Sequence, residues 1–232
     1  MSERVAVVTG GGRGIGRAIC ARFAADGAQV VAAARSVTEL EETRQAIEQA
    51  GGRCHVQLTD VTEPEDVDGL ITASAERFGR IDVLVNNAGV APLARIEELD
   101  PQVFELNLAV NVGAVYRSCR AVWPVMKAQR SGVIVNISSV ASVDPFPGFS
   151  AYGAAKAWVN AWTQSLAAEG RPLGIRLFAV APGAVETRML RGAFPDFPQD
   201  QTLDPADVAE LVHALCQPAC RYASGQTIFM KR

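Results

Sequence analysis

Thr9-Gly10-Gly11-Gly12-Arg13-Gly14-Ile15-Gly16 is the stretch that decides the fold, because it joins a short apolar run to a longer helical pattern. The run that leads into it, Val5–Thr9, has the length and the β-branched content of a buried strand. Glycines at a turn from strand to helix let a phosphate approach the backbone closely, and the positive end of the helix attracts it. We therefore expect a dinucleotide site here, although a tight turn without a ligand would use the same residues.

The alternation of strand and helix continues along the chain. Strands that are each followed by a helix pair in parallel, and nearly continuous apolar strands indicate a sheet covered on both faces. The sequence predicts an α/β fold, a single-domain Rossmann-like doubly wound parallel sheet of about seven strands with helices on both faces. The expected strands are Val5–Thr9, Gln29–Ala33, Cys54–Leu58, Val83–Asn86, Val133–Ser138, Ile175–Val180 and Thr227–Met230.

Three segments carry signals for the beginning of a helix. Thr62-Glu63-Pro64-Glu65 has the pattern of a capping box with a proline in the first turn. Asp100-Pro101 and Asp204-Pro205 each place a capping carboxylate before a proline, which the first helical position tolerates.

Composition limits the classes of function. With 232 residues, 49% of them hydrophobic, and no Gly- or Ser-rich linker, the chain is expected to form one domain over residues 1–232. A net charge of −3 without dense Lys/Arg runs argues against nucleic acid or a membrane surface as a partner. No apolar run reaches the roughly 20 residues of a membrane span, and Met1-Ser2-Glu3-Arg4 leads straight into a strand instead of a signal peptide. We expect a cytoplasmic protein.

The five cysteines are odd in number and lack paired C-x-x-C spacing, which favours reduced thiols. Cys216 and Cys220 stand four positions apart (220−216), which is more typical of helix packing than of a metal site. His55 and His213 are isolated in the sequence, so neither is expected to be a ligand or a base. No metal is expected.

The most specific pattern lies in the second half of the chain. Ser139 precedes Tyr152 by thirteen positions (152−139), and Lys156 follows Tyr152 by four, one turn along the same helix face. A phenol has a pKa of about 10 and transfers a proton near neutral pH only where a cation and hydrogen bonds stabilise the phenolate. Lys156 is that cation, and the Ser139 hydroxyl can stabilise charge on a substrate oxygen. The set predicts acid–base chemistry at a C–O bond, with Tyr152 as acid in reduction and base in oxidation.

Together these motifs make the chain resemble the short-chain dehydrogenase/reductase family over nearly all of its length. Gly10, Gly14 and Gly16 fall at i, i+4 and i+6, which is the spacing of that family rather than G-x-G-x-x-G. The resemblance implies a fourth catalytic member, Asn111, which would hold a water that connects Lys156 to solvent.

The resemblance also implies contacts with a nicotinamide cofactor. Asp60 would accept from the adenine amine, Thr187 would orient the carboxamide, and Lys156 would bind the nicotinamide ribose. The complete set of expected cofactor-binding residues is Gly10, Gly12, Arg13, Gly14, Ile15, Gly16, Arg35, Ser36, Asp60, Val61, Asn87, Ala88, Gly89, Tyr152, Lys156, Pro182, Gly183, Val185 and Thr187.

Charge at the end of the second strand indicates which nicotinamide cofactor is used. An NAD site usually has Asp or Glu there for the ribose 2′-hydroxyl, whereas a 2′-phosphate needs cations. Here that position is Ala34, followed by Arg35 and Ser36, and Arg13 can reach the same phosphate from the glycine loop. Two arginines without an acidic rival favour NADP(H), although each alone can be a solvated surface group.

Residues 188–204 are expected to form a short substrate lid, whose Met, Phe and Pro side chains suggest a small or hydrophobic carbonyl substrate. Pro145–Phe149 would form the facing wall, although these aromatics can equally be core or interface residues. The pattern is most similar to 3-oxoacyl-carrier-protein reductases, but Leu173 replaces a basic residue of their carrier-docking face. The basic residues left for that role are Lys127, Arg130 and Arg171.

The expected activity is NADP(H)-dependent interconversion of a carbonyl and a secondary alcohol. Two alternatives remain, a non-catalytic NADP(H) sensor and an epimerase or dehydratase on the same fold. Retention of Tyr152 and Lys156 argues against the sensor, and the short lid argues against the epimerase or dehydratase.

Two long helices, at about Pro101–Lys127 and Tyr152–Ala168, carry apolar residues beyond one stripe, and burial against another subunit would cover them. The residues are Val115, Val122, Trp123, Val125 and Met126 in the first helix and Trp158, Val159, Trp162 and Leu166 in the second. Since the family pairs these helices across a two-fold axis, we expect a homodimer or homotetramer.

Overall fold

The computed structural model describes residues 4–232, so Met1–Glu3, part of the stretch read as lacking a signal peptide, lie outside the described residues. A seven-stranded sheet has the order β3-β2-β1-β4-β5-β6-β7, and every neighbouring pair is parallel. The strands are β1 (Val5–Thr9), β2 (Gln29–Ala34), β3 (Arg53–Leu58), β4 (Val83–Asn86), β5 (Gly132–Ile137), β6 (Ile175–Pro182) and β7 (Thr227–Met230). The predicted α/β fold with a parallel sheet is confirmed, and no strand end differs from its expected position by more than two residues.

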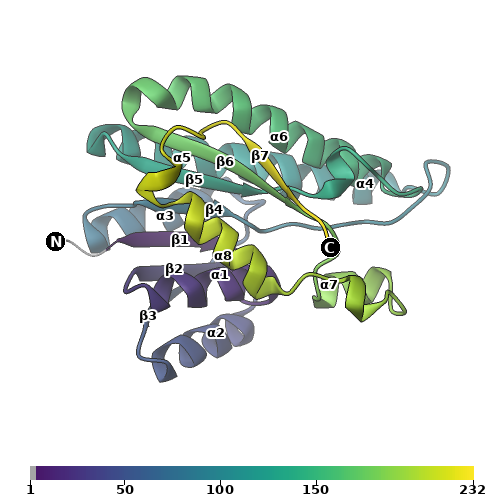
Figure 1. Cartoon of the computed structure of the whole chain (residues 1–232), viewed down its shortest axis with the longest axis horizontal. Helices are drawn as coiled ribbons and strands as arrows, with labels where there is room; N and C mark the ends of the chain where they lie inside the picture. Colours follow the sequence, from purple (N-terminus) through teal and green to yellow (C-terminus); the bar gives the residue numbers. More distant parts are fainter. Residues whose placement is uncertain (1–3) are drawn as a thin grey trace.

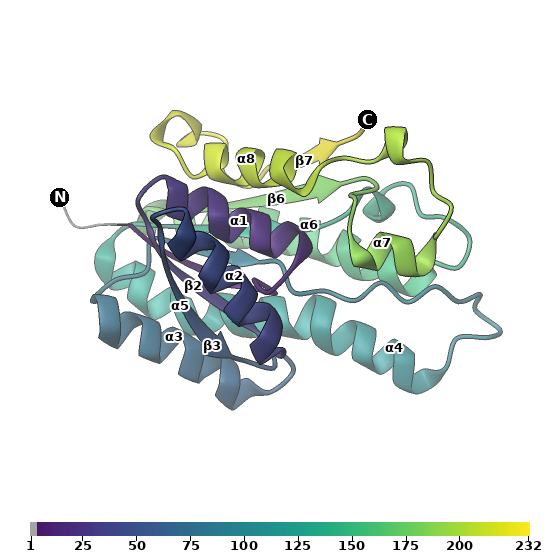
Figure 2. The ribbon, with the colours of Figure 1, turned by 90° about the horizontal axis from the view of Figure 1, so that it is seen from below.

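Helices cover both faces of the sheet (Figures 1 and 2). Helices α1, α2 and α8 pack on one face, and α3, α5 and α6 pack on the other. Their bounds, with those of the remaining helices, are α1 (Gly14–Ala25), α2 (Val37–Gln49), α3 (Pro64–Phe78), α4 (Pro101–Leu108), α5 (Ala114–Gln129), α6 (Ser150–Gly170), α7 (Arg188–Ala193) and α8 (Pro205–Leu215). Within residues 4–232, no helix is both long and apolar enough to cross a membrane.

Alternate residues of each strand supply two separate apolar cores. Val8 and Phe178 face the core under α1, α2 and α8, whereas Val7 and Leu177 face the core under α3, α5 and α6. All four side chains are fully buried, which stabilises the fold by about 1.5–3 kcal/mol for each. Burial on both faces explains why the strands read as continuous apolar runs.

A buried polar chain ties α6 to the centre of the sheet. The Asn86 amide donates to Asn136 Oδ1 at 2.8 Å, and the Asn136 amide donates to Thr163 Oγ1 at 2.8 Å. These groups come from β4, β5 and α6, and all three side chains are buried. Since buried polar groups are costly when unpaired, this chain fixes the position of α6 against the strand ends.

The helix beginnings were predicted correctly at two of the three segments. Asp100 accepts from the Gln102 amide at 2.7 Å, and Asp204 accepts from the Ala206 amide at 2.7 Å. The capping box at Thr62 is wrong, because α3 begins one residue later than that pattern requires and the Thr62 hydroxyl donates to Asp60 at 2.8 Å.

The expected long helix from Pro101 is interrupted by a π-helical segment. Helix α4 ends at Leu108, η1 (Ala109–Gly113) adds a wider turn, and α5 follows directly. Such π-turns inside helices frequently mark functional positions, and this one contains Asn111.

The predicted outward faces of the two long helices are partly wrong. Val115, Val122, Met126, Val159 and Leu166 are buried within the subunit. Trp123, Val125, Trp158 and Trp162 are half-buried against the same core. The large apolar side chains that α4 and α5 do expose are Val103, Phe104, Leu106, Leu108 and Tyr116.

The cysteines are free thiols, as expected. Cys216 lies just past the end of α8, and Cys220 belongs to a separate 3-10 turn, so they do not share one helix. Within the described residues, no cluster of His, Cys, Asp and Glu has the form of a metal site. His213 is not isolated in space, because its Nε2 lies 3.0 Å from Asp26 Oδ2, and this hydrogen bond lowers the pKa of Asp26.

Candidate active site

Ser139, Tyr152 and Lys156 meet at the carboxyl ends of the central strands. Ser139 follows β5, and the other two residues lie in the first two turns of α6. Lys156 is 4% exposed, its Nζ donates to the Ile137 carbonyl at 2.8 Å, and Nζ lies 5.7 Å from the centre of the Tyr152 ring. The Ser139 hydroxyl also accepts from the Ala141 amide at 3.1 Å, so Ser139 caps a turn as well as facing Tyr152.

The neighbouring Ser138 has a structural role. It is buried, and its hydroxyl donates to the Lys156 carbonyl at 3.1 Å. This hydrogen bond holds α6 against the end of β5. Both serines line the cavity, and Ser139 is the one whose hydroxyl forms a hydrogen bond with Tyr152.

We expected Lys156 to lower the pKa of Tyr152, but in the free protein burial has the larger effect on both groups. Burial raises the pKa of Tyr152, and the hydrogen bond from Ser139 only partly opposes that effect. Burial lowers the pKa of Lys156 from 10.5 to about 8. Each group is therefore driven toward its neutral form by the loss of water around it.

This burial predicts a pH-dependent contribution of Lys156 to stability. Between about pH 8 and pH 10 the unfolded lysine keeps a proton that the folded one has released, so the free energy of unfolding rises with pH. We expect the free energy of unfolding of the coenzyme-free wild type, minus that of Lys156→Met, to increase from about pH 7 to about pH 10. Denaturant titrations of both proteins measure it, and a constant or falling difference contradicts it.

Asn111 lies beside Lys156 at the π-turn. It is fully buried, its amide donates to the Val90 carbonyl and to Asn107 Oδ1, both at 2.8 Å, and its Oδ1 accepts from the Val90 amide at 3.3 Å. A Cβ built on Gly89 would lie 3.1 Å from Asn111 Oδ1 and 3.7 Å from Lys156 Nζ. Because a side chain at this position would press against the amide oxygen, glycine lets the Gly89 backbone lie close to both polar groups.

Asn107 was not among the expected site residues. Its amide donates to the Ala151 carbonyl at 3.0 Å, immediately before Tyr152, while its oxygen accepts from Asn111. It therefore links the π-turn to α6. The spacing of four positions to Asn111 is the only signal in the sequence that indicates this link.

The glycine loop forms a cradle that larger residues would fill. Gly10 and Gly14 have φ of 66° and 51°, a region that glycine adopts without strain. A Cβ on Gly16 would lie 2.1 Å from the Gly10 carbonyl oxygen, so helix and loop can only pack this closely at glycine. Asn87 secures the loop, since its amide donates to the carbonyls of Thr9 and Gly10 at 2.9 and 3.2 Å.

The opposite side of the groove comes from the segment after β6. Gly183 donates its amide to the Met230 carbonyl at 2.9 Å, and Thr187 caps α7 by accepting from the Leu190 amide at 3.3 Å. A Cβ on Gly14 would lie 3.2 Å from Thr187 Cγ2. The glycine loop and the base of α7 are therefore close neighbours, and Pro182 and Val185 line the space between them and the strands.

Asp60, Arg35 and Ser36 lie at the end of the groove beside β2. Asp60 accepts from the amide and the hydroxyl of Thr62 at 2.9 and 2.8 Å, and its Oδ2 lies 3.8 Å from Arg35. Burial by itself would raise the pKa of Asp60, but the bonds from Thr62 and the charge of Arg35 outweigh it and lower that pKa. Ser36 caps α2 by accepting from the Glu39 amide at 3.3 Å.

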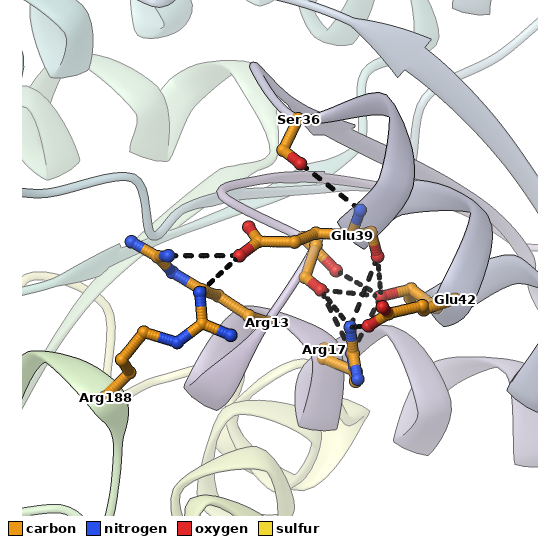
Figure 3. Close-up of polar contacts among 9 residues, drawn as sticks. Arg13, Arg17, Ser36, Glu39, Glu42 and Arg188 are labelled. Atoms are coloured by element: carbon orange, nitrogen blue, oxygen red, sulfur yellow. Dashed lines mark hydrogen bonds and ion pairs between the residues drawn. The ribbon is translucent and has the colours of Figure 1, made fainter.

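The expectation that no carboxylate competes with a 2′-phosphate for the arginines is wrong. Glu39 Oε1 accepts from Arg13 at 3.0 Å and from Arg188 at 2.8 Å (Figure 3). Glu39 stands on the first turn of α2, five positions after Ala34, so it falls outside the usual place for an acidic residue. Neither Glu39 nor Arg188 was among the expected site residues.

The expected residues line one continuous groove. Its volume is about 1070 Å³, enough for a dinucleotide with a small substrate, and all of the expected catalytic residues except Asn111 line it. At its outer end, the rings of Phe146, Phe149 and Phe194 have centroids 5.9–6.2 Å apart, and Phe149 lies 5.3 Å from Tyr152. A glycine cradle at the beginning of α1, with Tyr152 and Lys156 further along the same groove, fits a nicotinamide dinucleotide.

Comparison with known proteins agrees with this geometry. Residues 4–197 match the model of the short chain dehydrogenase family. The 3β-hydroxysteroid dehydrogenase 1 of Eggerthella lenta is 36% identical over 242 aligned positions, which cover 99% of this chain and 93% of that protein. The chain belongs to the short-chain dehydrogenase/reductase family.

Solved structures of family members share the whole fold. A 3-ketoacyl-(acyl-carrier-protein) reductase from Brucella melitensis, complexed with NADH, is 32% identical with a TM-score of 0.91 and covers 100% of this chain and 98% of its own. A variant actinorhodin polyketide ketoreductase with NADPH is 29% identical with a TM-score of 0.94, covering 99% and 96%. This short-chain dehydrogenase/reductase is thus an oxidoreductase of the hydroxyl/carbonyl type, for which a nicotinamide cofactor is expected.

Proposed function

We propose that the protein is an NADP(H)-dependent reductase that converts a small hydrophobic ketone to a secondary alcohol, and that also catalyses the reverse reaction. The observation that carries this proposal is the convergence of Ser139, Tyr152 and Lys156 beside the glycine cradle, in one groove. The bound cofactor would supply the hydride.

The side chains then divide the proton chemistry. Tyr152 donates its phenolic proton to the substrate oxygen as the carbonyl is reduced, and it accepts that proton in the reverse direction. Ser139 donates a hydrogen bond to the same oxygen and so stabilises the charge that develops there. Lys156, in its charged form, binds the ribose hydroxyls and stabilises the phenolate. Asn111 holds a water through which a proton returns from solvent to Lys156.

The preference for NADP(H) rests on the cations around β2. Ala34 places no carboxylate at the strand end, and Arg35 beside it has a side chain that is 65% exposed, which leaves it accessible to a phosphate. Arg13 faces the same end of the groove from the glycine loop. The remaining expected contacts, Gly12, Ile15, Val61 and Ala88, line the groove between this end and Tyr152.

The outer wall supports a hydrophobic substrate. Phe146, Phe149 and Phe194 surround the approach to Tyr152, and Phe194 belongs to the segment 188–204 that we propose as the lid of a single domain over residues 1–232. A 3-oxoacyl thioester is one such substrate, and Arg171 on the 3-10 turn with Leu173 is an exposed cation available to a carrier.

Turnover with a panel of ketones, followed by the loss of NADPH absorbance, tests the activity. We expect oxidation of NADPH with hydrophobic ketones and, in the reverse direction, reduction of NADP with the matching alcohols. Binding of NADPH without turnover of any carbonyl would favour the sensor, whereas a change in the substrate without net change in the cofactor would favour the epimerase or dehydratase.

We also propose that the protein is a homodimer or homotetramer through α4, α5 and α6. Tyr116 packs edge-on against Trp162, which stacks on Trp158, and the exposed Phe104 and Leu108 lie on α4. Burial against a second subunit would remove these apolar side chains from water.

Light scattering is expected to give two or four times the chain mass of 24.6 kDa. Changing Phe104 and Tyr116 together to Glu should reduce that mass, because a charge in an apolar interface loses its hydration. The exposed Leu58→Glu, on β3 and away from this face, is the control. A wild-type monomer at micromolar concentration would contradict this assembly.

A further inference from the structure

The carboxylate of Glu39 occupies a small anion site built from distant parts of the chain. Arg13 belongs to the glycine loop, Glu39 to the first turn of α2, and Arg188 to the first position of α7. Both guanidinium groups point at one oxygen, Oε1, at 3.0 and 2.8 Å (Figure 3). Arg188 and Glu39 are 149 positions apart in the sequence, so the bridge ties the lid to the cofactor end of the groove.

The conformation of Glu39 is itself informative. Ser36 and Glu39 have the S-x-x-E spacing of a capping box, and the Ser36 hydroxyl accepts from the Glu39 amide as that motif requires. In such a box the glutamate usually returns to the backbone of the capping residue. Here the carboxylate extends instead to the two arginines, and its side chain is only 19% exposed.

The charges of this bridge do not balance. Two guanidinium groups share one carboxylate, so the bridge keeps a net positive charge, whereas Arg35 at the same end of the groove is paired with Asp60 at 3.8 Å. Arg13 and Arg188 have side chains 54% and 73% exposed, and ion pairs this accessible contribute little to stability. A phosphate, which carries more charge than a carboxylate and offers more acceptor oxygens, is therefore able to displace Glu39 from its partners.

We propose that Glu39 is a coenzyme-specificity-determining residue, whose carboxylate competes with the 2′-phosphate of NADP(H) for Arg13 and Arg188. In the free protein the carboxylate holds the two arginines together, and a 2′-phosphate that takes its place also gains a cation from the lid. The inference rests on the proposed cofactor site but not on a preference for NADP(H), since any ligand with a 2′-phosphate meets the same two arginines even if the enzyme prefers NAD(H).

The test measures binding of two probes, adenosine 2′,5′-bisphosphate and adenosine 5′-monophosphate, by calorimetry. The probes differ only in the 2′-phosphate and need no turnover. Glu39→Gln removes the competing charge at nearly constant volume, so we expect it to bind the bisphosphate about five- to twentyfold more tightly than the wild type does. The affinity for the monophosphate should stay within about twofold, and Glu39→Asp, which keeps the charge, should lie nearer the wild type.

Glu42→Gln is the matched control. Glu42 stands one turn further along α2 and pairs at 2.8 Å with Arg17, whose guanidinium also donates to the Gly12 carbonyl and to Thr43. Its removal changes the net charge equally but frees no cation of the bridge, so neither affinity should change by more than about twofold. The double variant Glu39→Gln/Arg188→Gln should bind the bisphosphate less tightly than Glu39→Gln alone, because one of the two released cations is then missing.

The outcomes separate this inference from the proposed function. The role of Glu39 is overturned if Glu39→Gln raises the affinity for both probes equally or raises neither. It is also overturned if Glu42→Gln raises the affinity for the bisphosphate as much as Glu39→Gln does. A wild type that binds the monophosphate more tightly than the bisphosphate contradicts the proposed NADP(H) preference, while the ratio between Glu39→Gln and wild type still decides the role of Glu39. If neither probe binds to any variant, both proposals fail.

Discussion

Tyr152→Phe is expected to lower kcat by about a thousandfold, in the middle of the range that general acid–base catalysis contributes. The substitution keeps the ring, and with it the contact with Phe149 at 5.3 Å, but removes the hydroxyl that we propose as the proton donor to the substrate oxygen. Steady-state kinetics with NADPH and a ketone from the panel measures the effect.

Because only the hydroxyl is lost, NADPH should bind to Tyr152→Phe with nearly the wild-type affinity. Tyr116→Phe is the matched control, since Tyr116 is an exposed tyrosine on α5 that does not line the groove, and its kcat should remain at the wild-type value. Residual activity of Tyr152→Phe within about tenfold of the wild type would mean that another group supplies the proton.

Ala34→Asp is expected to reverse the coenzyme preference. The new carboxylate would stand at the end of β2, where it repels a 2′-phosphate and accepts from the ribose hydroxyls of NAD(H). Charge-assisted hydrogen bonds contribute about 1.5–3 kcal/mol, so the ratio of kcat/KM for NADPH to that for NADH should fall by about a hundredfold or more. Kinetics with both coenzymes measures this ratio.

Ala50→Asp controls for net charge, because it adds the same carboxylate just past the other end of α2. It should leave the ratio unchanged, whereas Arg35→Ala should weaken NADPH about ten- to a hundredfold and leave NADH nearly unaffected. A wild-type enzyme that already prefers NADH would overturn the argument from Ala34, Arg13 and Arg35.

Local chemistry explains why so much of the sheet could be predicted. Strands such as β1 and β5 are buried on both faces, so their sequences are dominated by Val, Ile and Ala, with Asn136 as a polar residue inside β5. The spacing of Tyr152 and Lys156 likewise determines one face of a helix, and the structure places both side chains where that periodicity predicts.

Features that depend on distant partners could not be predicted in this way. Which apolar residues of α5 and α6 face the core depends on how those helices are rotated, and the π-turn before α5 changes that rotation. The prediction of a capping box at Thr62 is wrong because the threonine hydroxyl donates to Asp60 instead. Nothing near Glu39 in the sequence indicates Arg188 as its partner.

Transfer of deuterium from NADPH labelled at the reactive C4 position to a ketone tests the central claim most directly. If the groove performs hydride transfer with Tyr152 as the acid, mass spectrometry should find one deuterium on the carbinol carbon of the alcohol product, and Tyr152→Phe should form almost none of this product. An alcohol without the label, or labelled NADPH that binds and remains unchanged with every ketone of the panel, would contradict the account.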